Sequence, residues 1–323
     1  MKNINLLTGS IAVLSVLTLG TVSLDAQVSR PLEVLQTNPD SRTAALGDVL
    51  GARQDRMSLF TSPLALIPAE GSFGIDASTQ IYPAIDGVDG RVMQYNVAAG
   101  YKFLDRHAVT LSFRYQGAPK IEAFNGISTP GQENYITPFE WAADAAYGFQ
   151  ISRDFSAMVS GNLIASYIGY GSYTGSFSVG GFYNHAFGDR SVVAAALKLN
   201  AVGAPLNYGA GMAFALPSNI QVSGEYGLNL DEKNHLDFLL GVTDYFIPAD
   251  ANLLLIGVGA EYDWDDLAFV RLGYRYGQNK MSRFTAGLGV KLFHRYALDA
   301  AYSHGTDKAV GLDVWSVGLT TRF

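Results

Sequence analysis

The sequence predicts an all-β chain, an antiparallel transmembrane β-barrel of the outer membrane of a Gram-negative bacterium, and three observations predict it. Long segments alternate apolar and polar side chains with a period of two, which is typical of strands with one apolar face. The chain begins with the pattern of a secretory signal peptide. It ends on an aromatic residue, Phe323, at the close of an alternating segment.

The composition suits a surface that faces lipid. Charged residues make up only 16% of the chain, against about 25% in soluble proteins, while Tyr and Phe number 18 each. The formal net charge of −7 offers no positive field for nucleic acid, which is excluded as a partner. The absence of cysteine excludes disulfides and thiolate metal sites.

Three regions follow from the N-terminus onward. Residues 1–26 read as a signal peptide, because Lys2 precedes the apolar run Ile11–Leu19 and small residues lead up to Ala26. An uncleaved anchor is the alternative, but the run is shorter than about 20 apolar residues. Residues 27–71 lack strand alternation and are predicted to be a hatch or plug, which hangs in the periplasm or packs into the barrel. Residues 72–323 are predicted to form the barrel.

The barrel prediction depends on the alternating segments, as in Leu267–Tyr276 and Ser282–Phe293. A soluble antiparallel sandwich also alternates. The segments here run about 10–14 residues, however, against about 5–6 in globular sheets, and aromatic residues gather near their ends, as at a membrane interface. Fifteen candidate strands begin near residues 72, 91, 107, 137, 155, 172, 190, 207, 219, 235, 253, 267, 282, 295 and 312.

Single-chain bacterial barrels have an even number of strands, so we expect fourteen and regard one candidate as wrong. The weakest are Asn207–Leu216 and His235–Phe246, because Pro and charged residues flank them closely. The last segment, Leu312–Phe323, resembles the signal that the barrel-assembly machinery reads, with Phe323 as its terminal aromatic. That machinery, membrane lipid and lipopolysaccharide are therefore expected partners.

The sequence predicts no enzyme, no metal site and no cofactor. The five histidines are scattered without metal-ligand spacing. Ser303 and His304 are adjacent on a strand, so their side chains point to opposite faces and cannot act as nucleophile and base. The acidic cluster Asp263, Asp265 and Asp266 is typical of a solvated turn.

Charges on the predicted inner faces are more informative. On the last strands these are Glu261, Arg271, Arg275, Lys291, Asp299 and Arg322, and on the predicted hatch they are Arg42, Asp48, Arg53, Asp55 and Arg56. Opposite charges in a shared lumen lower one another's cost of burial and could pin an inserted segment. The alternative is a wet lumen in which these charges are only hydrated.

Two regions of the chain resemble a known family. The stretch Asn38–Val49, which reads NPDSRTAALGDV, is similar to the Arg-x-x-x-(Met/Leu)-Gly-Asp/Gly opening of the PorV/PorQ family. Segments Gly259–Tyr262, Val270–Tyr274, Thr285–Lys291 and Leu298–Tyr302 occur in the family's order. The resemblance implies a 14-stranded barrel with an N-terminal hatch, similar to long-chain fatty-acid transporters and associated with type IX secretion in Bacteroidetes.

Two functions compete at this point. The first is docking, in which the barrel carries or anchors proteins exported by type IX secretion; its candidate surface is the long loop Ala118–Tyr135, with Ile121, Phe124 and Tyr135 as anchors. The second is transport of hydrophobic or other small solutes. An apolar pocket beneath the hatch would indicate transport, whereas paired lumen charges favour docking.

Overall fold

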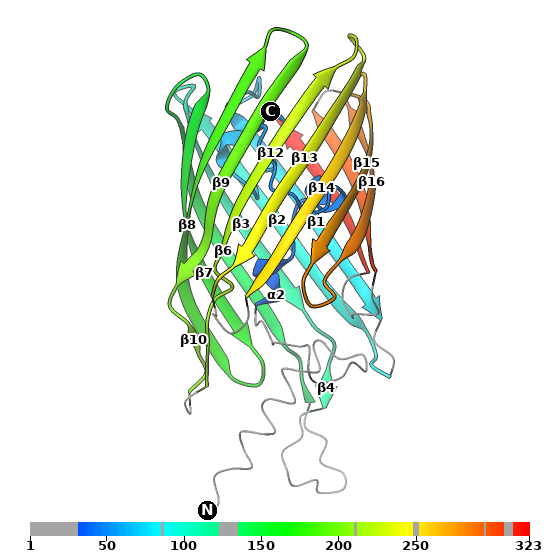
Figure 1. Ribbon diagram of the computed structural model, residues 1–323. Helices are drawn as coiled ribbons and strands as arrows, with labels where there is room; N and C mark the ends of the chain where they lie inside the picture. The colour runs from blue at the N-terminus through cyan, green and yellow to red at the C-terminus, as the bar shows by residue number, and fades with distance from the viewer. Residues whose placement is uncertain are drawn as a thin grey trace, which may run out of the picture.

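The computed structural model describes residues 32–84, 87–122, 135–209, 212–247, 252–293, 295–306 and 313–323. The predicted signal peptide and Phe124 lie outside these residues. Within them, fourteen antiparallel strands close into one tilted barrel (Figure 1). The barrel strands are β1 (Phe73–Ala84), β2 (Arg91–Phe103), β3 (His107–Gly117), β6 (Phe139–Gln150), β7 (Phe155–Tyr167), β8 (Gly171–Phe187), β9 (Ser191–Gly203), β12 (Asn219–Asn229), β13 (Asn234–Tyr245), β14 (Leu253–Trp264), β15 (Ala268–Gly277), β16 (Arg283–Leu292), β17 (Tyr296–Gly305) and β18 (Val314–Arg322).

Each barrel strand pairs with its sequence neighbours in the wall, and β1 pairs with β18 to close the sheet. The prediction of a closed barrel with fourteen strands is therefore confirmed. Closure leaves no unpaired edge, which is the condition for crossing a bilayer with strands. No helix in the described part of the chain is long and apolar enough to span a membrane.

The candidate strand Asn207–Leu216 is wrong. This segment forms a small hairpin of β10 (Leu206–Asn207) and β11 (Ala213–Phe214) outside the barrel sheet. Pro205 and Pro217 bracket it, and proline removes a ladder hydrogen bond. The other weak candidate, His235–Phe246, corresponds to β13 of the wall.

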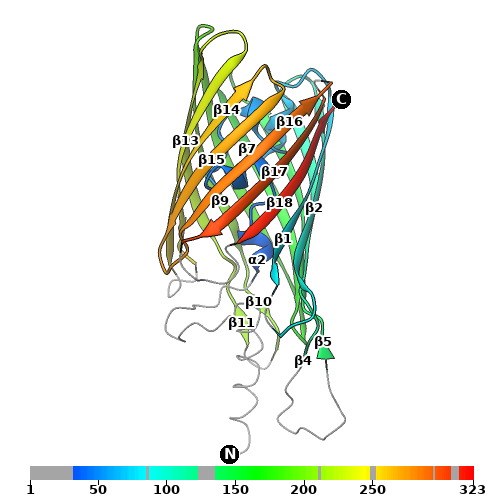
Figure 2. The ribbon, with the colours of Figure 1, turned by 90° about the vertical axis from the view of Figure 1, so that its right-hand side faces the viewer.

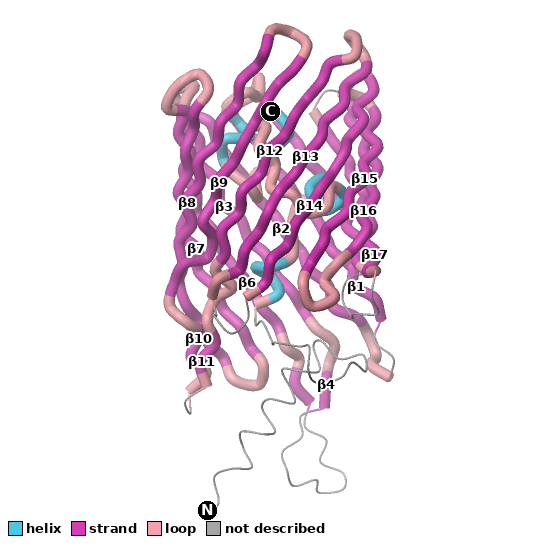
Figure 3. The backbone as a smooth tube through the Cα atoms, in the orientation of Figure 1, coloured by secondary structure: helices cyan, strands magenta, loops and turns pink. Residues whose placement is uncertain are grey.

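The alternation reflects two environments. On β15 the outward side chains of Val270 and Leu272 are 48% and 63% exposed, whereas the inward Arg271 and Arg275 are 3% and 7% exposed. The apolar face thus forms the outside of the barrel and the polar face lines the lumen, which is the reverse of a soluble sheet. Figure 3 shows the continuous strand wall with few helical segments inside it.

The two ends of the barrel differ (Figure 2). We call the end where β18 and the chain finish the C-terminal rim. We call the opposite end, where β4 (Ile121–Glu122), β5 (Tyr135–Ile136), β10 and β11 lie, the hairpin rim. Phe323 anchors the C-terminal rim: its backbone N–H donates to Phe73 at 2.7 Å and its carbonyl accepts from Phe73 at 2.9 Å.

Residues 32–71, here called the inner segment, lie inside the barrel (Figure 1). The segment passes from the hairpin rim towards the C-terminal rim and carries α2 (Glu33–Gln36), α3 (Ser41–Ala45) and two 3-10 turns, η1 (Gln54–Arg56) and η2 (Pro63–Leu66). Helix α2 contacts β3 and β6, α3 contacts β15 to β18, and η2 contacts β2, β3, β6 and β7. The segment therefore touches most of the wall.

Candidate functional site: the lumen

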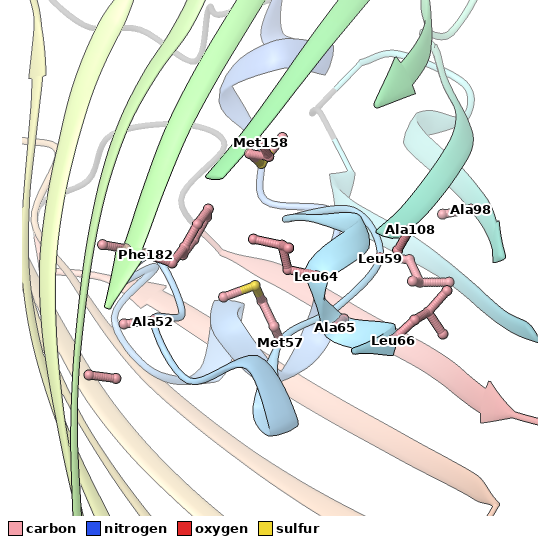
Figure 4. Packing of buried hydrophobic residues seen from close by; sticks show 12 residues of the cluster. Ala52, Met57, Leu59, Leu64, Ala65, Leu66, Ala98, Ala108, Met158 and Phe182 are labelled. Carbon is pink, nitrogen blue, oxygen red and sulfur yellow. The ribbon is translucent and has the colours of Figure 1, made fainter. Parts of the chain in front are cut away.

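The inner segment has an apolar part near the C-terminal rim (Figure 4). Leu59, Leu64 and Leu66 are buried there. They pack against four small wall residues, Ala98, Ala108, Ala194 and Ala196, and against Met158 and Phe182. Gly148 permits this approach, because a Cβ at that position would lie only 2.9 Å from the Leu64 side chain. The small wall residues thus make room for a segment that could not fit against larger ones.

The other part of the inner segment is held by charge, and Arg42 is its centre. Its Nε and Nη2 each donate to the Glu261 carboxylate at 3.0 Å, and Nη2 lies 3.4 Å from Glu225. Glu261 is fully buried and also accepts from Arg271, which pairs in turn with Asp299. One chain of alternating charges therefore joins α3 to β12, β14, β15 and β17.

Two further arginines extend this contact. Arg53 pairs with Asp237 of β13 and, at 2.6 Å, with Asp55 of the inner segment. Arg56 pairs with Asp263 of β14. Asp263 is buried, so its expected place in a solvated turn is wrong, whereas Asp265 pairs with Lys233 and Asp266 with Lys291 at the exposed rim.

A third contact lies nearer the hairpin rim. The Asp48 carboxylate accepts from Arg275 at 2.8 Å and also from Arg283, so two guanidinium groups meet one carboxylate. Gly47 makes this turn possible, since its φ is +69° and an added Cβ would lie 2.6 Å from the Val258 carbonyl. Only glycine adopts that conformation without cost.

The sequence-predicted charges are thus placed in three ways. Arg42 meets the wall at Glu261 and Asp48 meets it at Arg275, while Arg271 and Asp299 continue the first of these contacts along the wall. Arg53 and Arg56, with Asp55 beside them, meet the wall at Asp237 and Asp263. Arg322 pairs with Asp76 of the neighbouring strand β1 instead of the inner segment. Lys291 pairs with Asp266 at 2.6 Å on the C-terminal rim, and Asp266 in turn lies 3.9 Å from Arg56 of the inner segment.

Sequence reasoning missed several partners, namely Asp76, Glu225, Asp237, Asp263 and Arg283. Each of them lies on the inward face of an alternating strand. Applying the alternation test to every inward position of every strand would have found them.

Charges on the inner segment are strongly stabilised in their ionised forms. Burial alone would lower the pKa of Arg42, but the charges of Glu261 and Glu225 outweigh it and raise that pKa well above its usual value. Burial would likewise raise the pKa of Asp55, but Arg53 beside it holds that pKa below the ordinary value. Both groups therefore stay charged at neutral pH.

A cavity of about 170 Å³ lies between the inner segment and the wall. The charged residues that line it are Asp48, Arg114, Asp144, Lys198 and Arg275. Arg114 Nη2 donates to both carboxylate oxygens of Asp144 at 3.0 Å, and Lys198 Nζ donates to the Thr61 carbonyl at 3.1 Å. The pocket that a transporter was expected to have is apolar, whereas this one mixes polar and apolar walls.

The remaining predicted positions lie outside the lumen. Ile121 and Tyr135 belong to the β4–β5 hairpin, where Tyr135 is half exposed beneath Lys120. Phe323 stacks on Phe73 with ring centroids 6.4 Å apart. In the described ranges, no group of three or more His, Asp or Glu residues is placed to hold a metal ion.

No family model and no curated protein sequence matches the chain. Solved structures do. The toluene transporter TodX of Pseudomonas putida matches with a TM-score of 0.59 over 87% of this chain and 95% of its own, at 11% identity. The monoaromatic hydrocarbon channel CymD matches with a TM-score of 0.57 over 88% of this chain and 97% of its own, at 10% identity. The chain therefore shares the fold of these two barrels, and the low sequence identity supports a shared fold only.

Proposed function

We propose that this protein is an outer-membrane channel that lets a small solute cross through its lumen, with the inner segment as a hatch. The observation that carries the proposal is a cavity of about 170 Å³ that lies in the lumen between a closed barrel wall and the inner segment. TodX, a toluene transporter, and CymD, a monoaromatic hydrocarbon channel, share this fold along nearly their whole length. The role assigned to the lumen is passage, without a catalytic step.

The orientation in the membrane follows from the two rims. The outward apolar band favours a bilayer around the wall, and the C-terminal strand of such barrels ends in the periplasm. The C-terminal rim then faces the periplasm and the hairpin rim faces the outside. A solute enters at the hairpin rim and reaches the cavity before it meets η2.

The apolar part of the hatch is the part that yields. Residues 57–66 contain no charged side chain, whereas Arg42, Arg53 and Arg56 hold the preceding part through buried ion pairs. Apolar contacts are non-directional and can be remade, whereas breaking a buried ion pair leaves a charge without its partner. Movement of residues 57–66 breaks the hydrogen bonds of Leu59 N–H to Asp76 and of Lys198 to the Thr61 carbonyl, but no ion pair. This movement therefore opens the way from the cavity to the periplasm at the lowest cost.

Two disulfide locks test this. The chain has no cysteine, so a Cys pair at Leu64 and Gly148 would lock the apolar part, and a pair at Ser41 and Ser316, whose hydroxyl oxygens lie 2.7 Å apart, would lock the charged part. In proteoliposomes, we expect the first lock to stop uptake of small solutes until it is reduced, and the second to leave uptake unchanged. Equal uptake through both locked forms would contradict the proposed path.

Docking of exported proteins, as the PorV/PorQ resemblance implies, is the second candidate. The half-exposed Tyr135 at the hairpin rim and the firmly paired hatch charges favour it. Replacing residues 118–135 with a short Gly/Ser linker should then abolish capture of a secreted partner and leave the barrel assembled. If capture survives and solute uptake changes instead, transport is the better assignment.

A further inference from the structure

We infer that the solute bound in the lumen cavity is a small organic anion, such as a carboxylate with a single ring or a short chain. This inference rests on the proposed function, because it names the class of solute that the channel takes. It depends on three features of the cavity: its size, its excess of positive charge and its mixed lining.

The size of the cavity restricts the solute. Its volume is about 170 Å³, and a cavity of about 150 Å³ accommodates benzene. Drug-sized ligands occupy pockets of about 300–1,000 Å³. The cavity therefore holds one ring or a few carbon atoms, and a long acyl chain does not fit within it.

Lys198 supplies the first positive charge. Its Nζ donates to the Thr61 carbonyl, and no carboxylate of the described residues forms an ion pair with it. The nearby carboxylate of the lining, Asp144, already accepts from Arg114 Nη2 at both oxygens and from the Ser112 hydroxyl at 2.9 Å. An ammonium group in a lumen without a counter-charge favours binding of an anion.

Arg275 supplies the second. Its Nη1 shares the Asp48 carboxylate with Arg283, so that site holds two guanidinium groups and one carboxylate. Arg275 Nε has no acceptor within the described part of the chain, and Nη2 has only the Met281 carbonyl at 3.5 Å. Arg275 therefore brings to the lining a positive charge that Asp48, which it shares with Arg283, does not fully offset.

The balance of charges over the whole lining also favours an anion. Three cations, Arg114, Lys198 and Arg275, face two carboxylates, Asp48 and Asp144. A neutral hydrocarbon would desolvate these groups without replacing their hydrogen bonds, which is costly. A cation would meet like charge. Among solutes of this size, an anion alone gains from the arrangement.

The cavity also has an apolar side that suits the remainder of the molecule. Leu59, Phe60, Met158 and Leu255 belong to the same lining. An organic anion can place its charge towards the cations and its ring or chain against these side chains. Inorganic phosphate would leave the apolar side without contacts, so its affinity should be lower.

Calorimetric titration of the purified full-length protein in detergent tests the inference. Benzoate should bind at least about tenfold more tightly than benzyl alcohol, benzylammonium or inorganic phosphate, because one charge-assisted contact contributes about that factor. Lys198→Gln and Arg275→Gln should each weaken benzoate binding about tenfold or more. Lys102→Gln is the matched control: Lys102 also donates to carbonyls of the inner segment, at Ile67 and Ala69, but does not line the cavity.

Arg275→Lys guards against a folding defect, since it keeps the positive charge beside Asp48. It should bind benzoate more tightly than Arg275→Gln does, and both variants should run as folded barrels on gels without heating. Benzyl alcohol that binds as tightly as benzoate, or benzoate binding that is unchanged in both Gln variants, would overturn the inference. Proteoliposome uptake separates the two proposals. If benzyl alcohol crosses but benzoate does not bind, only this inference is overturned. If benzoate binds but no solute crosses, the proposed channel function is overturned.

Discussion

Replacing Arg42 with leucine should release the inner segment from the wall, because this guanidinium makes its largest set of buried polar contacts. Arg42 donates to Glu261, Glu225 and the Arg56 carbonyl. Leucine fills part of the same space and removes all of these bonds. Glu225 and Glu261 would then be buried with fewer counter-charges.

The size of the effect follows from the burial. Removing one partner of a buried ion pair costs about 3–5 kcal/mol. Glu261 keeps Arg271 as a partner and Glu225 still accepts from the backbone N–H groups of Ala52 and Arg53, so we take the lower end, about 3 kcal/mol. That corresponds to a rise on the order of 100-fold in the fraction of molecules with the segment undocked.

Thiol labelling measures this fraction directly. A Ser41→Cys background places the single thiol of the chain at a residue that is 3% exposed beside Arg42. When closing is faster than reaction, the labelling rate is proportional to the undocked population. Arg42→Leu should raise the rate on the order of 100-fold, and Arg42→Lys, which keeps the charge without the forked geometry, should give a smaller rise.

Arg190→Leu is the matched control, because Arg190 is exposed in the turn after β8. The labelling rate of this variant should stay within about twofold of the Ser41→Cys background, because surface substitutions seldom change the stability by more than about 0.5 kcal/mol. A rate for Arg42→Leu that is equally unchanged would refute the view that buried charges hold the segment.

Three further outcomes are expected. Gly47→Ala should raise the same labelling rate, since the left-handed backbone alone costs about 1–2 kcal/mol for a residue with a Cβ. Gly51→Ala should leave the rate unchanged, because no atom lies within 4 Å of the added Cβ. Equal rates for the two variants would contradict this prediction. Burial raises the pKa of Glu33, against the opposing effects of its hydrogen bond to Gln116 and the charge of Arg283. The docked Glu33 carboxyl therefore holds its proton more firmly than the free one, and its deprotonation weakens docking. Hydrogen-exchange protection of residues 33–37 should fall as pH rises above 4.5. Glu33→Gln should remove this pH dependence. Deleting Phe323 should lower the yield of assembled barrel on immunoblots of membrane fractions while Phe323→Tyr preserves it, and an undiminished yield would remove the assembly-signal assignment.

The sequence predicts the wall well because one local rule governs it. Alternation identifies strands wherever one face meets lipid, and the predicted starts near 91, 107 and 155 coincide with the observed ones. The rule failed at Asn207–Leu216, where the apolar side chains Leu206, Tyr208 and Leu216 pack against one another and Leu32. A small buried cluster and a membrane-facing strand contain the same apolar residue types, so the composition of a segment alone does not distinguish one structure from the other.

The contacts of the lumen are less predictable. Alternation places Glu261 and Arg271 on inward faces, and the short hairpin between β14 and β15 puts them opposite each other. Nothing local connects Arg42 with Glu261, which lies 219 residues away. That contact depends on the curvature of the whole wall and the path of the inner segment. The cavity is harder still to predict, because its shape depends on the packing of every side chain that surrounds it.

The place of the inner segment in the chain has a consequence for biogenesis. It is synthesised before every strand, yet the Ala45 carbonyl bonds to Thr285 of β16 and the Ser41 hydroxyl to Ser316 of β18. The chain then passes the β1–β18 seam so closely that a Cβ on Gly71 would overlap the Phe323 carbonyl. The inner segment must therefore wait for the last strands before it can dock. Closure of the seam and docking of the segment are then one late event, and we expect the assembly machinery to shield the open edges of the wall until Phe323 is in place.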